Sequence, residues 1–100
     1  MSRHSNASRL LRALQPMLPE ASFRIIHERP WHSLTFAGTQ ICISVLVADS
    51  SMENAQHFMQ YLPDHEFNLS GTLVADIAVT ETYCDTGQQS LVIDALVLDD

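Results

Sequence analysis

Apolar and polar side chains alternate along several stretches of the chain, and these stretches predict β-strands. The most regular alternation covers 41–47, where apolar residues share one face: Ile41, Ile43, Val45 and Val47. Weaker patterns at 23–28 and 31–36 predict two further strands, separated by Arg29-Pro30 because proline cannot donate to a strand ladder. We predict a turn at 37–40, which contains Gly38, before the strongest strand.

A long hairpin is predicted in the last third of the chain, with arms at 73–82 and 90–98 around Asp85-Thr86-Gly87. Each arm presents apolar residues on one face: Leu73, Ala75, Ile77 and Val79 in the first, and Leu91, Ile93, Ala95 and Val97 in the second. The second arm is apolar on its other face as well: Val92, Leu96 and Leu98. A homodimer partner, the first helix or a central place in the sheet would each cover it.

Two stretches carry apolar residues at helical spacing, 8–18 and 51–62, and prolines 16, 19 and 63 limit their ends. Together these patterns predict an α+β fold of two layers in the order α-β-β-β-α-β-β. In this fold a mainly antiparallel sheet has two helices on one face.

The length of 100 residues predicts a single domain spanning 1–100, with 1–6 flexible. No apolar run approaches the roughly 20 residues that a membrane span needs. Cys42 and Cys84 lie far apart without a CxxC motif, which favours a reduced, cytoplasmic protein.

The charges are strongly separated along the chain. All five basic side chains are arginines within residues 1–29, whereas from position 30 onward every charged residue is acidic, and the net charge is −7. Such a chain would repel a phosphate backbone, so we expect no nucleic-acid partner.

A few residues are candidates for binding or chemistry. Asp76 and Asp94 interrupt otherwise apolar strands opposite the core residues, so hairpin pairing would set them opposite or diagonal to each other. They form either a carboxylate pair that recruits a proton or cation, or two solvated aspartates on the polar face of a half-buried sheet. His65 follows the second helix and is a weak candidate for a general base.

Trp31 is the single tryptophan and follows Arg29-Pro30. Its ring either anchors a partner, with Arg29 stacked on it, or packs in the core. The chain contains no GxGxxG, GxSxG or locally spaced metal-ligand motif, so we predict no cofactor, no metal site and no catalytic residue.

The segment 28–38 resembles an R-P-W-x-S-x-x-F-x-G pattern found in a set of small, uncharacterised bacterial proteins. Residues 65–67 (H-E-F) and 71–77 (G-x-x-V-A-D-I) are similar to later segments of these proteins, as is the ending 93–96. The resemblance implies a small bacterial cytoplasmic domain and brings no known activity with it.

We therefore expect a small acidic protein that acts as a non-enzymatic protein–protein interaction or dimerisation module. Its partner would be another protein or a second copy of the chain, and neither nucleic acid nor a membrane. The alternative is a small-molecule-binding domain or modest enzyme that uses Asp76, Asp94 and His65 in a pocket between sheet and helices.

Overall fold

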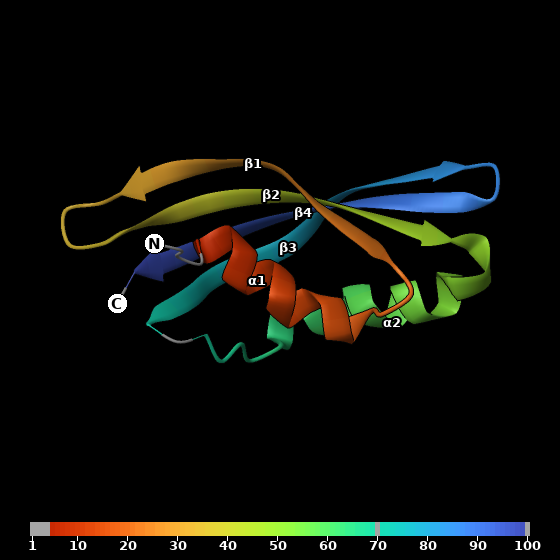
Figure 1. Cartoon of the computed structure of the whole chain (residues 1–100), viewed down its shortest axis with the longest axis horizontal. Coiled ribbons are helices and arrows are strands. Elements are labelled where there is room, and N and C mark those ends of the chain that lie inside the picture. The colour runs from red at the N-terminus through yellow and green to blue at the C-terminus, as the bar shows by residue number, and fades with distance from the viewer. Residues whose placement is uncertain (1–4, 70, 100) are drawn as a thin grey trace.

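The chain folds into one four-stranded antiparallel sheet with two helices packed on one of its faces (Figure 1). The computed structural model describes residues 5–69 and 71–99. Its elements are α1 (Asn6–Leu14), β1 (Ser22–His32), β2 (Ala37–Ala48), α2 (Met52–Tyr61), β3 (Thr72–Asp85) and β4 (Gln88–Asp99). Short 3-10 turns follow α1 and flank α2. The α+β class and the antiparallel sheet agree with the prediction.

The strands lie in the order β1-β2-β4-β3, so β1 and β3 form the two edges of the sheet. In the middle of the sheet, Ile43 of β2 pairs with Ile25 of β1 on one side and with Ile93 of β4 on the other. Each hairpin joins neighbouring strands, and the pairing of β2 with β4 joins the two hairpins. The sheet is strongly twisted, and both helices lie below it in Figure 1.

The hydrophobic core lies between the sheet and the helices. The alternating residues predicted for the strongest strand and for the last strand are all buried there: Ile41, Ile43, Val45, Val47, Leu91, Ile93, Ala95 and Val97. The helices contribute Leu10 and Leu14 from α1 and Ala55 and Phe58 from α2. The rings of Phe58 and Phe23 pack edge to face, with centroids 6.1 Å apart.

The predicted order contained one strand too many. The separate strands expected at 23–28 and 31–36 are a single strand, β1, which continues through Arg29-Pro30 to His32. The turn lies at 33–36, before the predicted position, and Ser33 and Phe36 hydrogen-bond across it. Pro30 is tolerated because β1 has a neighbour on one side only, so a strand at the sheet edge can lack a donor.

Gly38 lies within β2 and not in a turn. A Cβ atom at this position would lie 2.2 Å from the carbonyl oxygen of Val97 and 2.9 Å from Cα of Leu98. The backbones of β2 and β4 approach each other closely here, which leaves room only for glycine.

The face predicted for the first arm of the hairpin was partly wrong. The register of β3 against β4 shifts between Val74 and Asp76 and again between Val79 and Glu81. Each bulge interrupts the alternation, so Ile77 and Val79 face the core as predicted, whereas Leu73 is 60% exposed on the other face. A similar bulge in β1 follows Ile25.

Ser5 caps helix α1 by accepting a hydrogen bond from the backbone N–H of Ser8 at 3.1 Å, so the helix includes residues before the apolar pattern at 8–18. The amide of Asn6 donates to Thr39 Oγ1 (3.2 Å) and to Asp99 Oδ1 (2.8 Å), which ties the start of α1 to β2 and β4. Of the segment 1–6, predicted to be flexible, positions 1–4 lie outside the described residues. Over 5–69 and 71–99, no helix has the length and apolar character needed to cross a bilayer.

Candidate functional site

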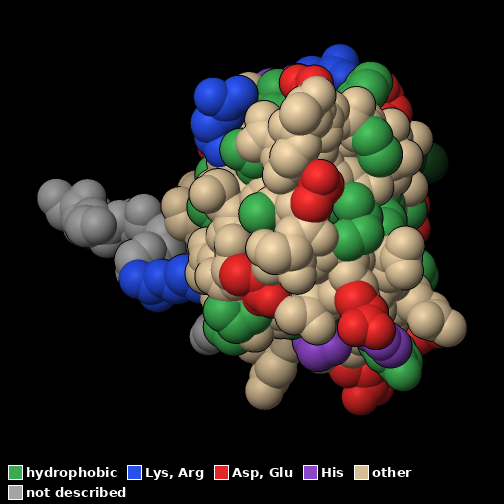
Figure 2. Space-filling view, turned by 90° about the vertical axis from the view of Figure 1, so that its right-hand side faces the viewer, with side chains coloured by type: hydrophobic (Ala, Val, Ile, Leu, Met, Phe, Trp, Pro, Cys, Tyr) green, Lys and Arg blue, Asp and Glu red, His purple; other side chains and the backbone are tan. Residues whose placement is uncertain are grey.

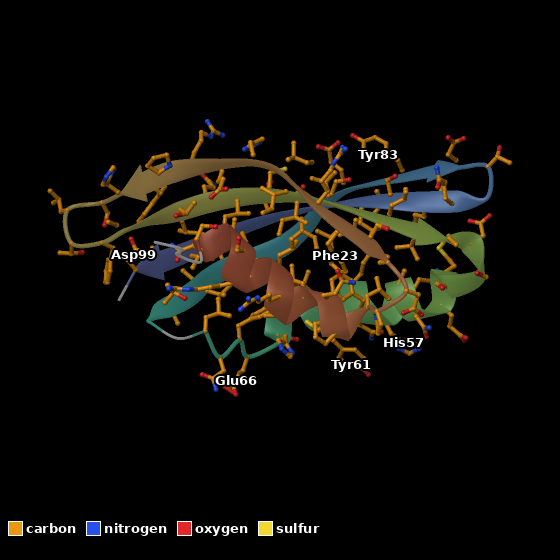
Figure 3. All side chains as sticks on the ribbon, in the orientation of Figure 1. Phe23, His57, Tyr61, Glu66, Tyr83 and Asp99 are labelled. Carbon is orange, nitrogen blue, oxygen red and sulfur yellow. The ribbon has the colours of Figure 1, made fainter. Side chains whose placement is uncertain are left out.

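The sheet face that carries no helix is the candidate site, and we call it the open face. Its side chains form cross-strand rows, each read here from β1 through β2 and β4 to β3. In order along the sheet, the rows are Trp31, Gly38, Leu98 and Leu73; Arg29, Gln40, Leu96 and Asp76; His27, Cys42, Asp94 and Ala78; Arg24, Ser44, Val92 and Glu81; Ser22, Leu46, Ser90 and Tyr83. In Figure 3, Tyr83 stands on this side of the sheet, whereas His57, Tyr61 and Glu66 lie on the helix side.

The open face is unusually apolar for a sheet surface without a covering layer. Val92, Leu96 and Leu98 of β4 are half-buried, while Leu46 and Tyr83 are 41% and 55% exposed. Of the covers expected from the sequence, the central place of β4 in the sheet is confirmed, and α1 packs on the opposite face. The central position buries the strand edges of β4 but leaves its outward-facing side chains uncovered.

Charges of opposite sign lie along opposite edges of the open face. Arg24 and Arg29 lie on β1, whereas Asp76 and Glu81 lie on β3, and Asp94 adds a third carboxylate on β4. Three strand spacings of about 4.8 Å place the two edges roughly 14 Å apart, too far for ion pairs within one chain. Figure 2 looks onto the end of the molecule where β3 turns into β4, and there acidic side chains spread over the surface while arginines lie at its margins.

Asp76 and Asp94 lie on the face opposite the core, in the diagonal relation that the alternation allows. Asp76 pairs with Leu96, and Asp94 pairs with Ala78 in the next row, so both carboxylates are exposed neighbours on the open face. His65 is not brought to them, because it follows α2 on the helix side and packs its ring against Phe67 at 4.6 Å. Among the described residues, no group of three His, Cys, Asp or Glu side chains is placed to hold a metal ion.

Trp31 and Arg29 also lie on the open face, at the end of β1 next to the 33–36 turn. Trp31 is half-buried and opens the row that ends in Leu73, while Arg29 is exposed and opens the row that ends in Asp76. Four of the five residues singled out from the sequence therefore share one surface, and His65 is the exception.

A buried thiol at the centre of the open face escaped the sequence prediction. Cys42 is only 8% exposed, but it faces away from the helices in the row of Asp94. Burial raises the pKa of this thiol, and its hydrogen bond to the Asp94 carboxylate raises the pKa further. Only the pairing of β2 with β4 brings the two side chains together, so no local motif could reveal them.

We expect Asp94→Asn to increase the alkylation rate of Cys42, because removing the carboxylate lowers the pKa of the thiol and exposes more thiolate at neutral pH. The measurement is the iodoacetamide reaction rate against pH in a Cys84→Ser background, since Cys84 is an exposed free cysteine. Asp76→Asn, one row away, serves as the control. Equal rates for both asparagine variants would contradict the coupling between Cys42 and Asp94.

A hollow of about 350 Å³ lies at one end of the open face, lined by Ser22, Arg24, Ser44, Leu46 and Ser90. The small serine side chains of three strands leave this space. Next to it along the same row, Tyr83 projects from β3 and donates its hydroxyl to Glu81, which raises the pKa of the phenol. One end of the open face thus carries both a projecting ring and a depression.

His65 instead lines a shallow depression of about 420 Å³ between the segment after α1 and helix α2. Its wall includes His57 and Tyr61, whose rings stack with centroids 6.3 Å apart, and Glu20, which accepts a hydrogen bond from Asn54 at 2.6 Å. This depression lies on the helix side of the molecule and shares no residue with the open face.

Comparison of the chain with protein-family models, with curated proteins and with solved structures gives no match in any of the three. The fold defines a two-layer α+β domain with one uncovered sheet face.

Proposed function

We propose that this chain is a non-enzymatic protein–protein interaction module and that the open face is its binding surface. The observation that carries the proposal is the set of apolar side chains on a face that no helix covers. They form two groups on either side of the row of Asp94: Trp31, Leu73, Leu96 and Leu98 in one, and Leu46, Tyr83 and Val92 in the other. Full burial of a leucine side chain contributes about 1.5–3 kcal/mol, so a partner that covers this surface gains substantial free energy. Large exposed apolar patches mark interaction sites on soluble domains.

The open face has the size of a small stable interface. Four strands at about 4.8 Å spacing are roughly 19 Å wide, and about ten residues at 3.3 Å per residue extend about 30 Å. A face of this size buries about 600 Å² on each partner, or about 1,200 Å² in total, which is the lower end of the range for specific complexes. The apolar side chains of the central strand β4 and the charged side chains of the edge strands follow the usual anatomy of such interfaces, with Asp94 as a charged residue near the centre.

The charge distribution supports a protein partner over nucleic acid. The net charge of −7 repels phosphates, and the arginines of the open face among residues 5–69 and 71–99, Arg24 and Arg29, lie along one edge. A cytoplasmic location belongs to the same proposal, supported by two free cysteines, of which Cys84 is exposed.

The alternative, a small-molecule site that combines Asp76, Asp94 and His65, has less support. The two aspartates and the histidine lie on opposite sides of the sheet, so they do not line a common pocket. Between sheet and helices, the side chains that would have to line such a pocket are fully buried against one another, as for Leu14, Val45 and Ile93.

Site-directed photo-crosslinking tests the interaction module. A benzophenone side chain in place of Leu96, at the centre of the open face, is expected to give protein adducts in extracts of cells that produce the chain. The same group in place of Gln60, exposed on α2, is the control and is expected to give none. Leu73→Arg, which places a charge beside Leu98 on the open face, should abolish the adducts at position 96.

Adducts with a second copy of the chain and adducts with another protein both support the module. Equal yields at positions 96 and 60, or yields at position 96 that Leu73→Arg leaves unchanged, would refute it.

A further inference from the structure

We propose that the partner of the open face is a second copy of this chain, packed face to face so that β1 of each copy lies over β3 of the other. This inference rests on the proposed function, because it uses the same surface and names its occupant. The arrangement of charges and the hollow on the open face both favour this pairing.

Two twofold axes can place one open face on another, since a closed dimer pairs the same patch on both copies. An axis that runs along the strands, between β2 and β4, reverses the strand order and keeps each row over the same row of the second copy. An axis that runs across the strands places β1 over β1 and reverses the order of the rows. Face-to-face sheets pack with their strands aligned to within about 30°, and both arrangements meet this condition.

The charges favour the axis along the strands. In that arrangement Arg29 lies over Asp76 of the second copy and Arg24 lies over its Glu81, and symmetry repeats both pairs. The other axis sets Arg29 over Arg24 and Asp76 over Glu81. Like charges that face each other across an interface are strongly unfavourable. The edges of opposite sign, too distant to pair within one chain, thus pair between chains.

One apolar contact also belongs to the axis along the strands. Trp31 comes to lie over Leu73 of the second copy, the most exposed leucine of the open face. The axis passes between β2 and β4, so each Asp94 lies over Cys42 of the second copy and the two Asp94 carboxylates do not face each other.

The hollow supplies a further match that does not depend on charge. The axis along the strands keeps each row over the same row of the second copy. It therefore brings Tyr83 of the second copy over Ser22, where the hollow of about 350 Å³ lies. The projecting ring then faces a depression lined mainly by small serine side chains. The axis across the strands would instead place Tyr83 over Leu73, at the far end of the face.

Charge reversal tests two parts of the proposal: that the partner is a second copy of the chain, and that the twofold axis runs along the strands. Asp76→Arg with Glu81→Arg puts arginines against arginines, and we expect the dimer dissociation constant to rise on the order of 100-fold. Adding Arg24→Glu and Arg29→Glu restores opposite charges between copies, and this fourfold variant should regain the dimer. It should not pair with the wild type, because every reversed edge would then face a like charge.

The measurement is sedimentation equilibrium over a range of concentrations, together with mixtures of tagged and untagged chains. The control is Glu53→Arg with Glu66→Arg, which changes the net charge equally at exposed positions away from the open face and should leave the dimer unchanged. Circular dichroism of each variant confirms folding, and the regained dimer of the fourfold variant shows that the loss in the twofold variant is not a loss of fold.

A wild type that stays monomeric at high micromolar concentration would overturn the self-pairing. Adducts with a different protein at position 96 would in that case still support the interaction module, so the two proposals fail separately. A fourfold variant that pairs with the wild type in preference to itself would overturn the axis along the strands. A control that weakens the dimer as much as the reversal at 76 and 81 would overturn the role of the edges.

Discussion

Replacing Ile93 by alanine is expected to lower the free energy of unfolding by about 2–5 kcal/mol, the usual cost of truncating a large core side chain. Ile93 is completely buried at the centre of the sheet, where it pairs with Ile43 of β2 and Val79 of β3. Neighbours held by two strands and two helices cannot collapse freely into the space, so the cavity adds to the lost burial. Urea unfolding followed by circular dichroism measures the change.

Val92→Ala provides the matched control, because Val92 is the preceding residue on the same strand and faces the other way. Its half-buried side chain on the open face should cost about 1 kcal/mol or less in dilute solution. Equal losses for the two variants would mean that the helices do not cover the face assigned to the core.

Replacing Gly38 by alanine is expected to lower the free energy of unfolding by up to about 3 kcal/mol, the upper range for overpacking. The added Cβ would lie 2.2 Å from the Val97 carbonyl oxygen, and a backbone atom in the middle of a sheet cannot rotate away. The two strands must separate locally, which strains their hydrogen bonds. Thermal unfolding of the dilute chain is the measurement.

Substitutions at Gly87 distinguish the effect of steric crowding from the effect of backbone conformation. It has no atom within 4 Å of its Cβ position, but its φ is +82°, so alanine is strained there by conformation alone. Asparagine tolerates that conformation and should recover stability at position 87, whereas Gly38→Asn should be at least as damaging as Gly38→Ala. Recovery with asparagine at position 38 would contradict the crowding argument.

The prediction from sequence succeeded where the pattern is local. The alternation at 41–47 and at 91–97 identified the core faces of β2 and β4, because a regular strand turns every second side chain to the same side. The helical spacing likewise located α1 and α2, with end points that differ by a few residues. The Asp85-Thr86-Gly87 turn also lies where the turn residues predicted it.

The prediction failed where a residue depends on a neighbour distant in sequence. Pro30 predicts a break in the strand, but proline is tolerated in an edge strand. The sequence does not indicate which strand lies at the edge. The sequence around Gly38 predicts a turn. In the structure, glycine is required there because a side chain would collide with the backbone of Val97, fifty-nine positions later. Leu73 reads as core, but the bulge before Asp76 turns it outward.

The same distinction between local pattern and tertiary structure applies to the candidate site. Alternation alone put Asp76 and Asp94 opposite the core and showed that β4 is apolar on both faces, since these properties belong to single strands. Tertiary structure decided that Arg29 shares a row with Asp76, that Cys42 lies beside Asp94, and that His65 lies apart from them. Those relations follow from the strand order β1-β2-β4-β3 and from the bulges. Both depend on which strands, distant in sequence, meet in the folded sheet, and no local pattern encodes that.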